Sequence, residues 1–121
     1  MCIRDRYYCR SIQKSEDDYS LTFFCAIDNG IVLTIAKPTG MVKSTEKILA
    51  TLAQELGNIN MILGFDCILR RLDATNRGTL DNISRVYSDA NVIGFGTYGE
   101  QFESMHINQT FTGIAFGPKP D

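Results

Sequence analysis

The chain has 121 residues, enough for one domain with one hydrophobic core but too few for two. Its residues are 44% hydrophobic and 21% charged, as in an ordinary globular protein, and its formal net charge is −2. This charge excludes the strongly basic proteins that bind nucleic acid, and no apolar run approaches the roughly 20 residues that cross a bilayer. We therefore expect neither nucleic-acid binding nor membrane insertion.

The first six residues, Met1 to Arg6, resemble the translated end of a transposon that is used to prepare sequencing libraries. Such a segment does not belong to the natural protein and carries no information about its fold. We expect residues 1–6 to be an adapter artefact and the chain to be a metagenomic fragment of a longer protein. Residues 7–19 are polar, and Ser15-Glu16-Asp17-Asp18 is typical of a solvated loop or linker.

Two apolar segments, 21–27 and 31–36, are rich in aromatic and branched residues and are predicted to be strands. Asp28-Asn29-Gly30 lies between them. An Asn-Gly pair favours the tight turn of a β-hairpin, because both central positions of that turn need a positive φ. The sequence therefore predicts a hairpin here, ended by Pro38 and Gly40.

A helix is predicted from Ser44, a plausible N-cap, to Gly57, which favours a left-handed C-cap. Residues 61–65 form a short apolar run that is typical of a buried strand. Residues 67–89 have apolar side chains at helical spacing, interrupted by Asn76-Arg77-Gly78. The pattern fits one long helix with a weak middle or two short helices, and it does not decide between them.

Two further strands are predicted at 91–98 and 107–116, joined by a polar connection. The resulting order is ββαβαββ. It predicts an α+β fold with a mainly antiparallel five-stranded sheet and two helices packed on one face. The domain is expected to span residues 20–117, followed by a tail at 118–121.

The four cysteines form no C-x-x-C pair, which argues against a structural zinc site. Cys25 and Cys67 lie within or beside apolar segments and are expected to fill the core. Hydrolytic chemistry is not indicated, because the sequence has neither a G-x-S-x-G nor an H-E-x-x-H motif. We expect a protein that is not an enzyme.

Gly94-Phe95-Gly96-Thr97-Tyr98-Gly99 matches G-x-G-x-x-G, but a dinucleotide site also needs a helix that opens on the motif and a later acidic residue. The segment after Gly99 indicates a strand and a tail, so the sequence does not support such a site. Gly94 and Gly96 share one strand face and leave it bare. That face could admit a ligand, or it could serve close packing.

Three stretches together resemble the C-terminal domain of FIST proteins over about residues 10–117. They are Ser20-Leu21-Thr22-Phe23-Phe24-Cys25-Ala26-Ile27-Asp28, Gly64-Phe65-Asp66-Cys67-Ile68-Leu69-Arg70-Arg71-Leu72, and Gly94-Phe95-Gly96-Thr97-Tyr98-Gly99-Glu100-Gln101 with His106-Ile107-Asn108-Gln109-Thr110. The resemblance is closest to the NosP-type branch, which binds haem and senses nitric oxide.

This resemblance implies a bacterial, cytoplasmic sensory domain that binds a small ligand and regulates a signalling partner. The implied partners are a histidine kinase, a cyclic-di-GMP enzyme or a chemoreceptor. The family usually pairs this domain with an N-terminal FIST domain, which is absent from this chain. A structural half-domain that completes such an N-terminal domain is therefore an alternative function.

His106 is the only histidine and hence the only imidazole available to hold haem iron. Asn108 shares its strand face. In the haem hypothesis, Gly94, Gly96 and Tyr98 would line the haem; in the plainer interpretation, His106 hydrogen-bonds within a loop. A haem-free sensor, for example of amino acids, is the alternative. Its polar groups would be Tyr98, Glu100, Gln101, Asn108 and Thr110.

Overall fold

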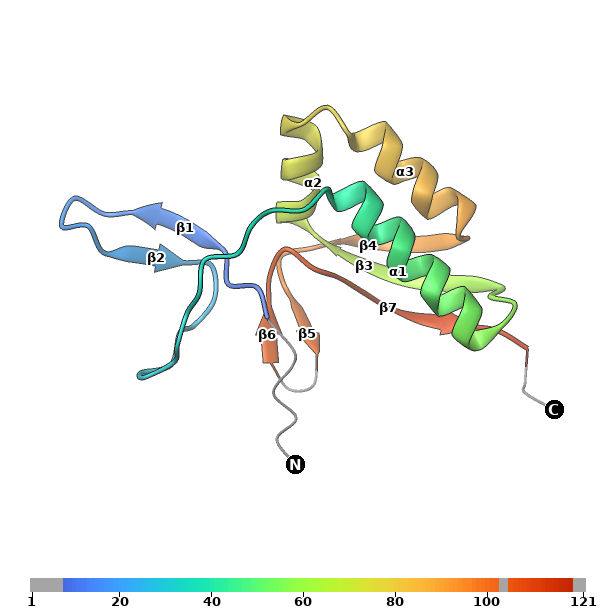
Figure 1. Cartoon of the computed structure of the whole chain (residues 1–121), viewed down its shortest axis with the longest axis horizontal. Coiled ribbons are helices and arrows are strands. Elements are labelled where there is room, and N and C mark those ends of the chain that lie inside the picture. The colour runs from blue at the N-terminus through green and yellow to red at the C-terminus, as the bar shows by residue number, and fades with distance from the viewer. Residues whose placement is uncertain (1–7, 103–104, 119–121) are drawn as a thin grey trace.

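The computed structural model describes residues 8–102 and 105–118. The expected adapter segment 1–6 and most of the expected tail lie outside these residues. Within these residues, three helices and seven strands follow one another, and Figure 1 shows their arrangement. They are β1 (Ile12–Ser15), β2 (Leu21–Phe23), α1 (Met41–Leu56), β3 (Met61–Cys67), α2 (Ile68–Asn76), α3 (Leu80–Asp89), β4 (Val92–Thr97), β5 (Glu100–Phe102), β6 (Met105–Ile107) and β7 (Phe111–Phe116).

The central sheet has three strands in the order β4-β3-β7. β3 runs parallel to β4 and antiparallel to β7. The prediction of an α+β fold is confirmed, but the prediction of one five-stranded, mainly antiparallel sheet is wrong. Two helices, α2 and α3, connect β3 to β4, and such a crossover carries the chain back so that the next strand runs parallel. β1–β2 and β5–β6 form separate two-stranded sheets.

Helix α1 begins three residues before the predicted N-cap. Gly40 is the N-cap and supplies no side-chain hydrogen bond, while the hydroxyl of Ser44 lies 3.2 Å from that of Thr39. The helix ends at Gly57 as predicted, but the cap is not left-handed helical, because Gly57 has φ +74° and ψ −139°. Residues with a Cβ rarely adopt that φ, so glycine is favoured at this position.

The segment from Cys67 to Asp89 forms two helices, which answers the question that the sequence left open and gives three helices where two were expected. The break lies at Arg77 to Thr79, next to the predicted Asn76-Arg77-Gly78 interruption. Gly78 has φ +64°, and the Thr79 N–H donates to the carbonyl of Ala74. The positive φ turns the chain so that α3 starts in a new direction.

The core lies between one face of the sheet and the helices. Its buried residues come from α1, β3, α2 and α3: Leu49, Ile62, Ala74, Ile83 and Val86. Each large aliphatic side chain in this group contributes roughly 1.5–3 kcal/mol by leaving water. The prediction that the helices pack on one face is therefore confirmed (Figure 1).

No helix of the described residues covers the other face of the sheet (Figure 1). Alternation along the strands places there the large apolar side chains that do not face the core. Four of them on the two outer strands are exposed: Ile93, Phe95, Ile114 and Phe116. Phe65 on β3 meets Phe95 edge to face, with ring centroids 5.3 Å apart. We call the side chains of Leu63, Phe65, Ile93, Phe95, Ile114 and Phe116 the open apolar face.

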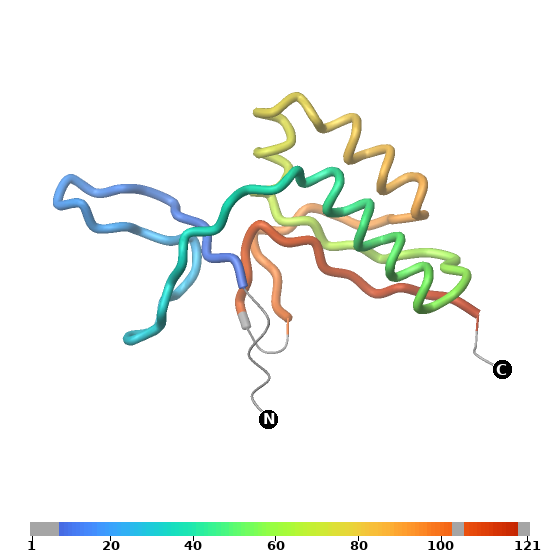
Figure 2. The backbone as a smooth tube through the Cα atoms, in the orientation of Figure 1, coloured from blue at the N-terminus to red at the C-terminus, as the bar shows by residue number. Residues whose placement is uncertain are grey.

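The predicted hairpin around Asn29-Gly30 does not form. β2 ends at Phe23, no strand is present over residues 31–36, and the antiparallel partner of β2 is β1, inside the segment that we expected to be a polar loop. Residues 28–40, which we call the arm, are exposed throughout. Figure 2 shows β1, β2 and the arm extending away from the helices and the central sheet. A strand needs a neighbour for its backbone hydrogen bonds, and the described chain offers none here.

The predicted last strand at 107–116 is divided. β6 ends at Ile107 and β7 starts at Phe111, with Gln109 at φ +56° between them. β5 lies in the connection that was expected to be irregular and pairs with β6, so that Gln101 lies opposite His106.

The predicted cysteine roles agree with the structure for Cys25 and Cys67, which are buried free thiols, while Cys9 is an exposed one. Within residues 8–102 and 105–118, no helix has both the length and the apolar character needed to cross a membrane.

Candidate functional site

A hydrogen-bond network begins where β3 ends and α2 starts. Asp66 is the second-last residue of β3, and Arg70 lies one helical turn later, so their side chains meet. The Arg70 Nε–H donates to Asp66 Oδ1 at 2.6 Å. The Arg70 side chain is only 11% exposed, so this ion pair is screened far less than a surface pair.

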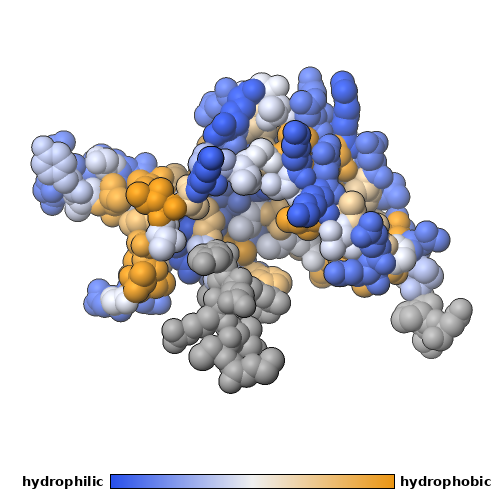
Figure 3. Space-filling model, viewed as in Figure 1, coloured by the Kyte–Doolittle hydropathy of each residue, from blue (hydrophilic) through white to orange (hydrophobic). Residues whose placement is uncertain are grey.

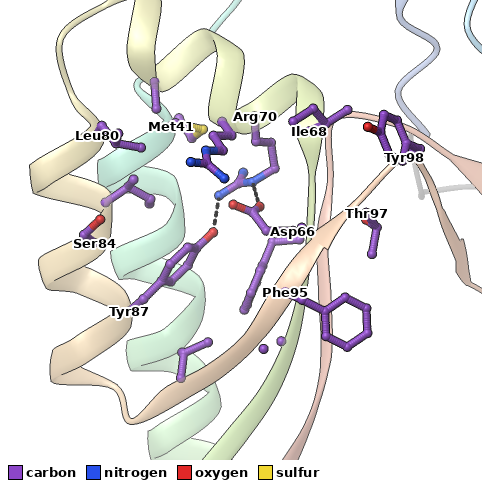
Figure 4. A pocket seen from close by; sticks show the side chains of 18 residues that line it. Met41, Asp66, Ile68, Arg70, Leu80, Ser84, Tyr87, Phe95, Thr97 and Tyr98 are labelled. Atoms are coloured by element: carbon purple, nitrogen blue, oxygen red, sulfur yellow. Dashed lines mark hydrogen bonds and ion pairs between the residues drawn. The ribbon is translucent and has the colours of Figure 1, made fainter.

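The same guanidinium joins α2 to the other two helices. Its Nη2–H groups donate to Thr45 Oγ1 on α1 and to Tyr87 Oη on α3, each at 3.0 Å. Figure 4 shows the bond to Tyr87. Arginine suits this position because it presents several donors in one rigid plane. Arg70 thus connects β3 and all three helices through single side-chain hydrogen bonds.

Burial controls the protonation of this network. Burial raises the pKa of Tyr87 from 10.0 to about 12, although the neighbouring Arg70 opposes the rise. Burial by itself would lower the pKa of Arg70, but Tyr87 and Asp66 more than offset that effect and the pKa rises. At neutral pH Tyr87 is therefore a neutral phenol and Arg70 is a cation.

An aromatic pair holds Tyr87 in place over a row of glycines. The Tyr87 ring stacks on Phe111 of β7 with centroids 4.9 Å apart. Gly94, Gly64 and Gly113 are in register across the three strands. A Cβ at Gly64 would lie 2.6 Å from a Phe111 ring atom, so Gly64 makes room for that ring.

Of the two predicted glycines, one is required by packing and the other borders open space. A Cβ at Gly94 would lie 1.7 Å from the carbonyl oxygen of Gly64, so the sheet itself requires glycine there. The nearest atom to a Cβ at Gly96 is 3.8 Å away, an ordinary contact distance. Gly94 is therefore required by the packing of β4 against β3.

A pocket of about 550 Å³ lies between these helices and β4. Gly94, Gly96 and Tyr98 belong to its lining, as do Asp66, Arg70 and Tyr87 of the network. Figure 4 shows Asp66, Arg70 and Tyr87 pointing toward one another inside it. The remaining lining residues are Met41, Gly64, Ile68, Arg71, Ala74, Leu80, Ile83, Ser84, Val92, Phe95, Thr97 and Phe111. The pocket reaches the carboxyl ends of two adjacent parallel strands, the usual place for ligands in α/β sheets.

The other predicted site residues form a separate cluster around Glu100. The Glu100 carboxylate is buried and accepts hydrogen bonds from the hydroxyls of Thr97 and Thr110, the latter at 2.5 Å. Asn108 is 1% exposed, and its two polar side-chain atoms have no hydrogen-bond partner within residues 8–102 and 105–118. Gln101 is exposed and takes no part in this cluster.

His106 has an exposed side chain on β6 and is not in the lining of the pocket beside α2 and α3. A Cβ at Gly99 would lie 2.3 Å from His106 Nε2, so the imidazole packs against that glycine. Among the described residues, no group of three or more His, Cys, Asp or Glu side chains is placed to hold a metal ion. The next element after Gly99 is strand β5 rather than a helix, as expected when the dinucleotide motif was set aside.

The sequence interpretation did not identify Asp66, Arg70 and Tyr87 as site residues. Asp66 and Arg70 stand four residues apart across a predicted strand–helix junction, and that spacing was the available signal. Tyr87 had no such signal, because its position on α3 was interpreted only as part of an apolar helical face.

A scan against protein families matches the model of the FIST C domain over residues 1–103. The matched region includes Asp66, Arg70, Tyr87 and Tyr98 and ends before His106. No curated protein and no solved structure matches the chain. The family match covers most of the 121 residues, so the chain belongs to the FIST C domain family, a family of signal-transduction sensory domains.

Proposed function

We propose that the chain is a sensory domain that binds a small polar ligand in the pocket between α2, α3 and β4. The observation that carries this proposal is the placement of the Arg70 guanidinium. It borders the pocket and is hydrogen-bonded to β3, α1 and α3 at the same time. A ligand that exchanges one of these hydrogen bonds for its own changes how the helices are held against the sheet. Such differential contact is what a sensor needs to shift between two conformations.

The pocket has the chemistry for a ligand with both charged and apolar parts, and an amino acid is our proposed class. Arg70, with the exposed Arg71, would receive the carboxylate, and Asp66 would receive the ammonium group. Apolar side chains such as Ile68, Leu80 and Ile83 line the remaining space. A volume of about 550 Å³ lies within the range that small-molecule sites occupy, about 300–1,000 Å³.

The test is isothermal titration calorimetry of the chain with a panel of amino acids, repeated on Arg70→Lys. This variant replaces the planar guanidinium, which has several donors in one plane, by a single ammonium group. It should weaken amino-acid binding by about tenfold or more. Arg77→Lys is the matched control, because Arg77, the C-cap of α2, makes an equivalent bond to Asp73 at 2.7 Å and its side chain is 60% exposed. The proposal is wrong if no amino acid binds, or if both lysine variants bind as the parent does.

The haem hypothesis, with His106 as the iron ligand and nitric oxide as the signal, remains a prediction. It is supported by the solvent access of the only imidazole in the chain. Haem proteins usually enclose the macrocycle in an apolar pocket, whereas His106 and its neighbour Gly99 lie on a small hairpin. A haem titration of the parent and of His106→Ala, followed by Soret absorbance, tests it. An unchanged haem affinity in the variant would exclude His106 as the ligand.

The proposed output is a contact with a histidine kinase, a cyclic-di-GMP enzyme or a chemoreceptor. The alternative function, a structural half-domain that completes an N-terminal FIST domain, is favoured by one observation. The open apolar face leaves large side chains in water, as expected of a domain that another one covers. Deleting this domain from a longer relative would then abolish folding, while the sensory proposal expects loss of ligand response only.

A further inference from the structure

The charged side chains that line the pocket between α2, α3 and β4 do not balance one another. They are two arginines and one aspartate: Arg70, Arg71 and Asp66. Asp66 and Arg70 form an ion pair at 2.6 Å, so their charges cancel. Arg71, the next residue of α2, has no opposite charge in the lining. A ligand in this pocket therefore meets one positive charge that the protein does not neutralise.

Arg71 has none of the contacts that hold Arg70 in place. Within residues 8–102 and 105–118, its side chain makes no ion pair and no hydrogen bond, and the residue is exposed. Figure 3 shows hydrophilic side chains across the outer surface of the helices, so this edge of the pocket is open to water. A guanidinium with all its donors available is suited to a carboxylate, because its planar fork matches both carboxylate oxygens.

Arg70 also keeps donors for a ligand. Its Nε and Nη2 atoms supply the bonds to Asp66, Thr45 and Tyr87. Its Nη1 atom makes no hydrogen bond within the described part of the chain, and it is not one of the buried polar atoms that lack a partner. The N–H groups of Nη1 can therefore reach a carboxylate oxygen before any of the three bonds is exchanged.

The rest of the lining adds hydrogen-bond donors but no further negative charge. Ser84 and Tyr87 lie on α3, across the pocket from Arg70 (Figure 4). The hydroxyl of a serine can donate to a ligand oxygen as well as accept. Of the described residues, Asp66 is the only carboxylate in the lining. The pocket thus offers one carboxylate for a cationic group and two guanidinium groups for anionic ones.

We propose that the ligand is an amino acid with an acidic side chain, aspartate or glutamate, and that Arg71 selects it. This inference rests on the proposed amino-acid site. The two arginines divide the two carboxylates, with the α-carboxylate at Arg70 and the side-chain carboxylate at Arg71, while Asp66 receives the ammonium group. The single negative charge of the ligand then cancels the unbalanced positive charge of the lining. A neutral amino acid would leave one guanidinium without a carboxylate, which lowers its affinity relative to the acid.

The experiment is isothermal titration calorimetry with glutamate, glutamine, aspartate and asparagine, because each acid and its amide have nearly the same size and shape. The parent should bind the acid about tenfold more tightly than the amide. In Arg71→Gln this ratio should fall below about threefold, since the side-chain carboxylate loses its partner. Arg85→Gln is the matched control, because Arg85 is an exposed arginine on α3 that does not line the pocket, and it should keep the ratio of the parent. Circular dichroism shows that both variants are folded.

The possible outcomes separate this inference from the proposed function. Amides that bind as tightly as the acids would refute the acidic ligand and leave the amino-acid proposal in place. A preference for the acid that persists in Arg71→Gln would assign the selection to another group and overturn the role of Arg71. If no amino acid binds at all, the proposed function itself is wrong, and this inference is wrong with it.

Discussion

Gly94 and Gly96 are two residues apart on β4, line the same pocket and look equivalent in the sequence. Their surroundings differ, because the carbonyl of Gly64 is directly beside Gly94 and nothing crowds Gly96. The sheet therefore depends on one of them, while the other leaves free space toward the pocket. Substituting each glycine in turn therefore separates the packing role of Gly94 from the role of Gly96 in leaving space for a ligand.

We predict that Gly94→Ala destabilises the fold by about 2 kcal/mol or more, because the new methyl group meets fixed backbone atoms. Gly96→Ala should change the unfolding free energy by less than about 1 kcal/mol. Urea denaturation of both variants measures the difference. Equal losses would show that the row of glycines does not set the spacing of the strands.

Tyr87 provides a prediction about pH. Its pKa is raised from 10.0 to about 12, so between these values the unfolded chain has lost this proton and the folded chain keeps it. The unfolded state then binds fewer protons, and stability must fall as the pH rises through this window. Below pH 10 the contribution is fully present.

Tyrosinate absorbance followed against pH should show one of the five tyrosines ionising near pH 12. Tyr87→Phe should remove this late step and leave the rest of the curve unchanged. It should also cost about 1 kcal/mol of stability, because Arg70 loses one acceptor but keeps Asp66 and Thr45. Tyr19→Phe is the control, since Tyr19 is 92% exposed. A late step that survives in Tyr87→Phe would assign it to another residue.

Element boundaries in this fold depend on the glycines at each end of α1. A methyl group added at Gly40 or at Gly57 would have no atom within 4 Å, so neither glycine is confined by packing. They differ in backbone conformation, with φ −64° at Gly40 and +74° at Gly57. Only Gly57 is in a region that residues with a Cβ avoid.

We expect Gly57→Ala to destabilise the protein by about 1–2 kcal/mol through backbone strain alone. Gly40→Ala should cost only about a few tenths of a kcal/mol, since glycine is a modest N-cap. Thermal unfolding of the two variants gives the comparison. If Gly57→Ala were as stable as Gly40→Ala, the chain would have to leave α1 along a different path.

The molecule as a whole is a helix layer on a small sheet, with two hairpins and an arm extending from it (Figure 1). β3 is hydrogen-bonded on both sides and carries the buried Ile62, so it belongs to the most stable part of the fold. The arm has exposed side chains and almost no backbone hydrogen bonds within the described chain. Local stability should therefore vary strongly along the chain.

Hydrogen exchange followed by mass spectrometry tests this contrast. Amides of β3 should exchange slowest, and amides of residues 31–36 should exchange at nearly the rate of an unfolded peptide. Strong protection of the arm would instead require a partner within the chain.

The sequence by itself determined the local features of this protein. Glycine at 57, the apolar runs of β3 and β4 and the buried thiols of Cys25 and Cys67 all follow from short-range chemistry, and all are present. The family resemblance, confirmed by the FIST C domain match, also came from short motifs. Such features depend on backbone preference and on the polarity of neighbouring residues, which can be read one segment at a time.

Only the tertiary structure decided which strands pair and which side chains meet. The arm has the composition of a strand, yet no strand forms there because pairing needs a neighbour that the sequence pattern cannot name. β3 and β4 are parallel neighbours because the helices between them cross over the sheet and bring the chain back beside β3. Arg70 meets Thr45 and Tyr87 from 25 and 17 residues away, contacts that exist only when three helices pack on one sheet. The pocket and the open apolar face are products of that packing, since alternation along a strand names two faces but not which one the helices cover.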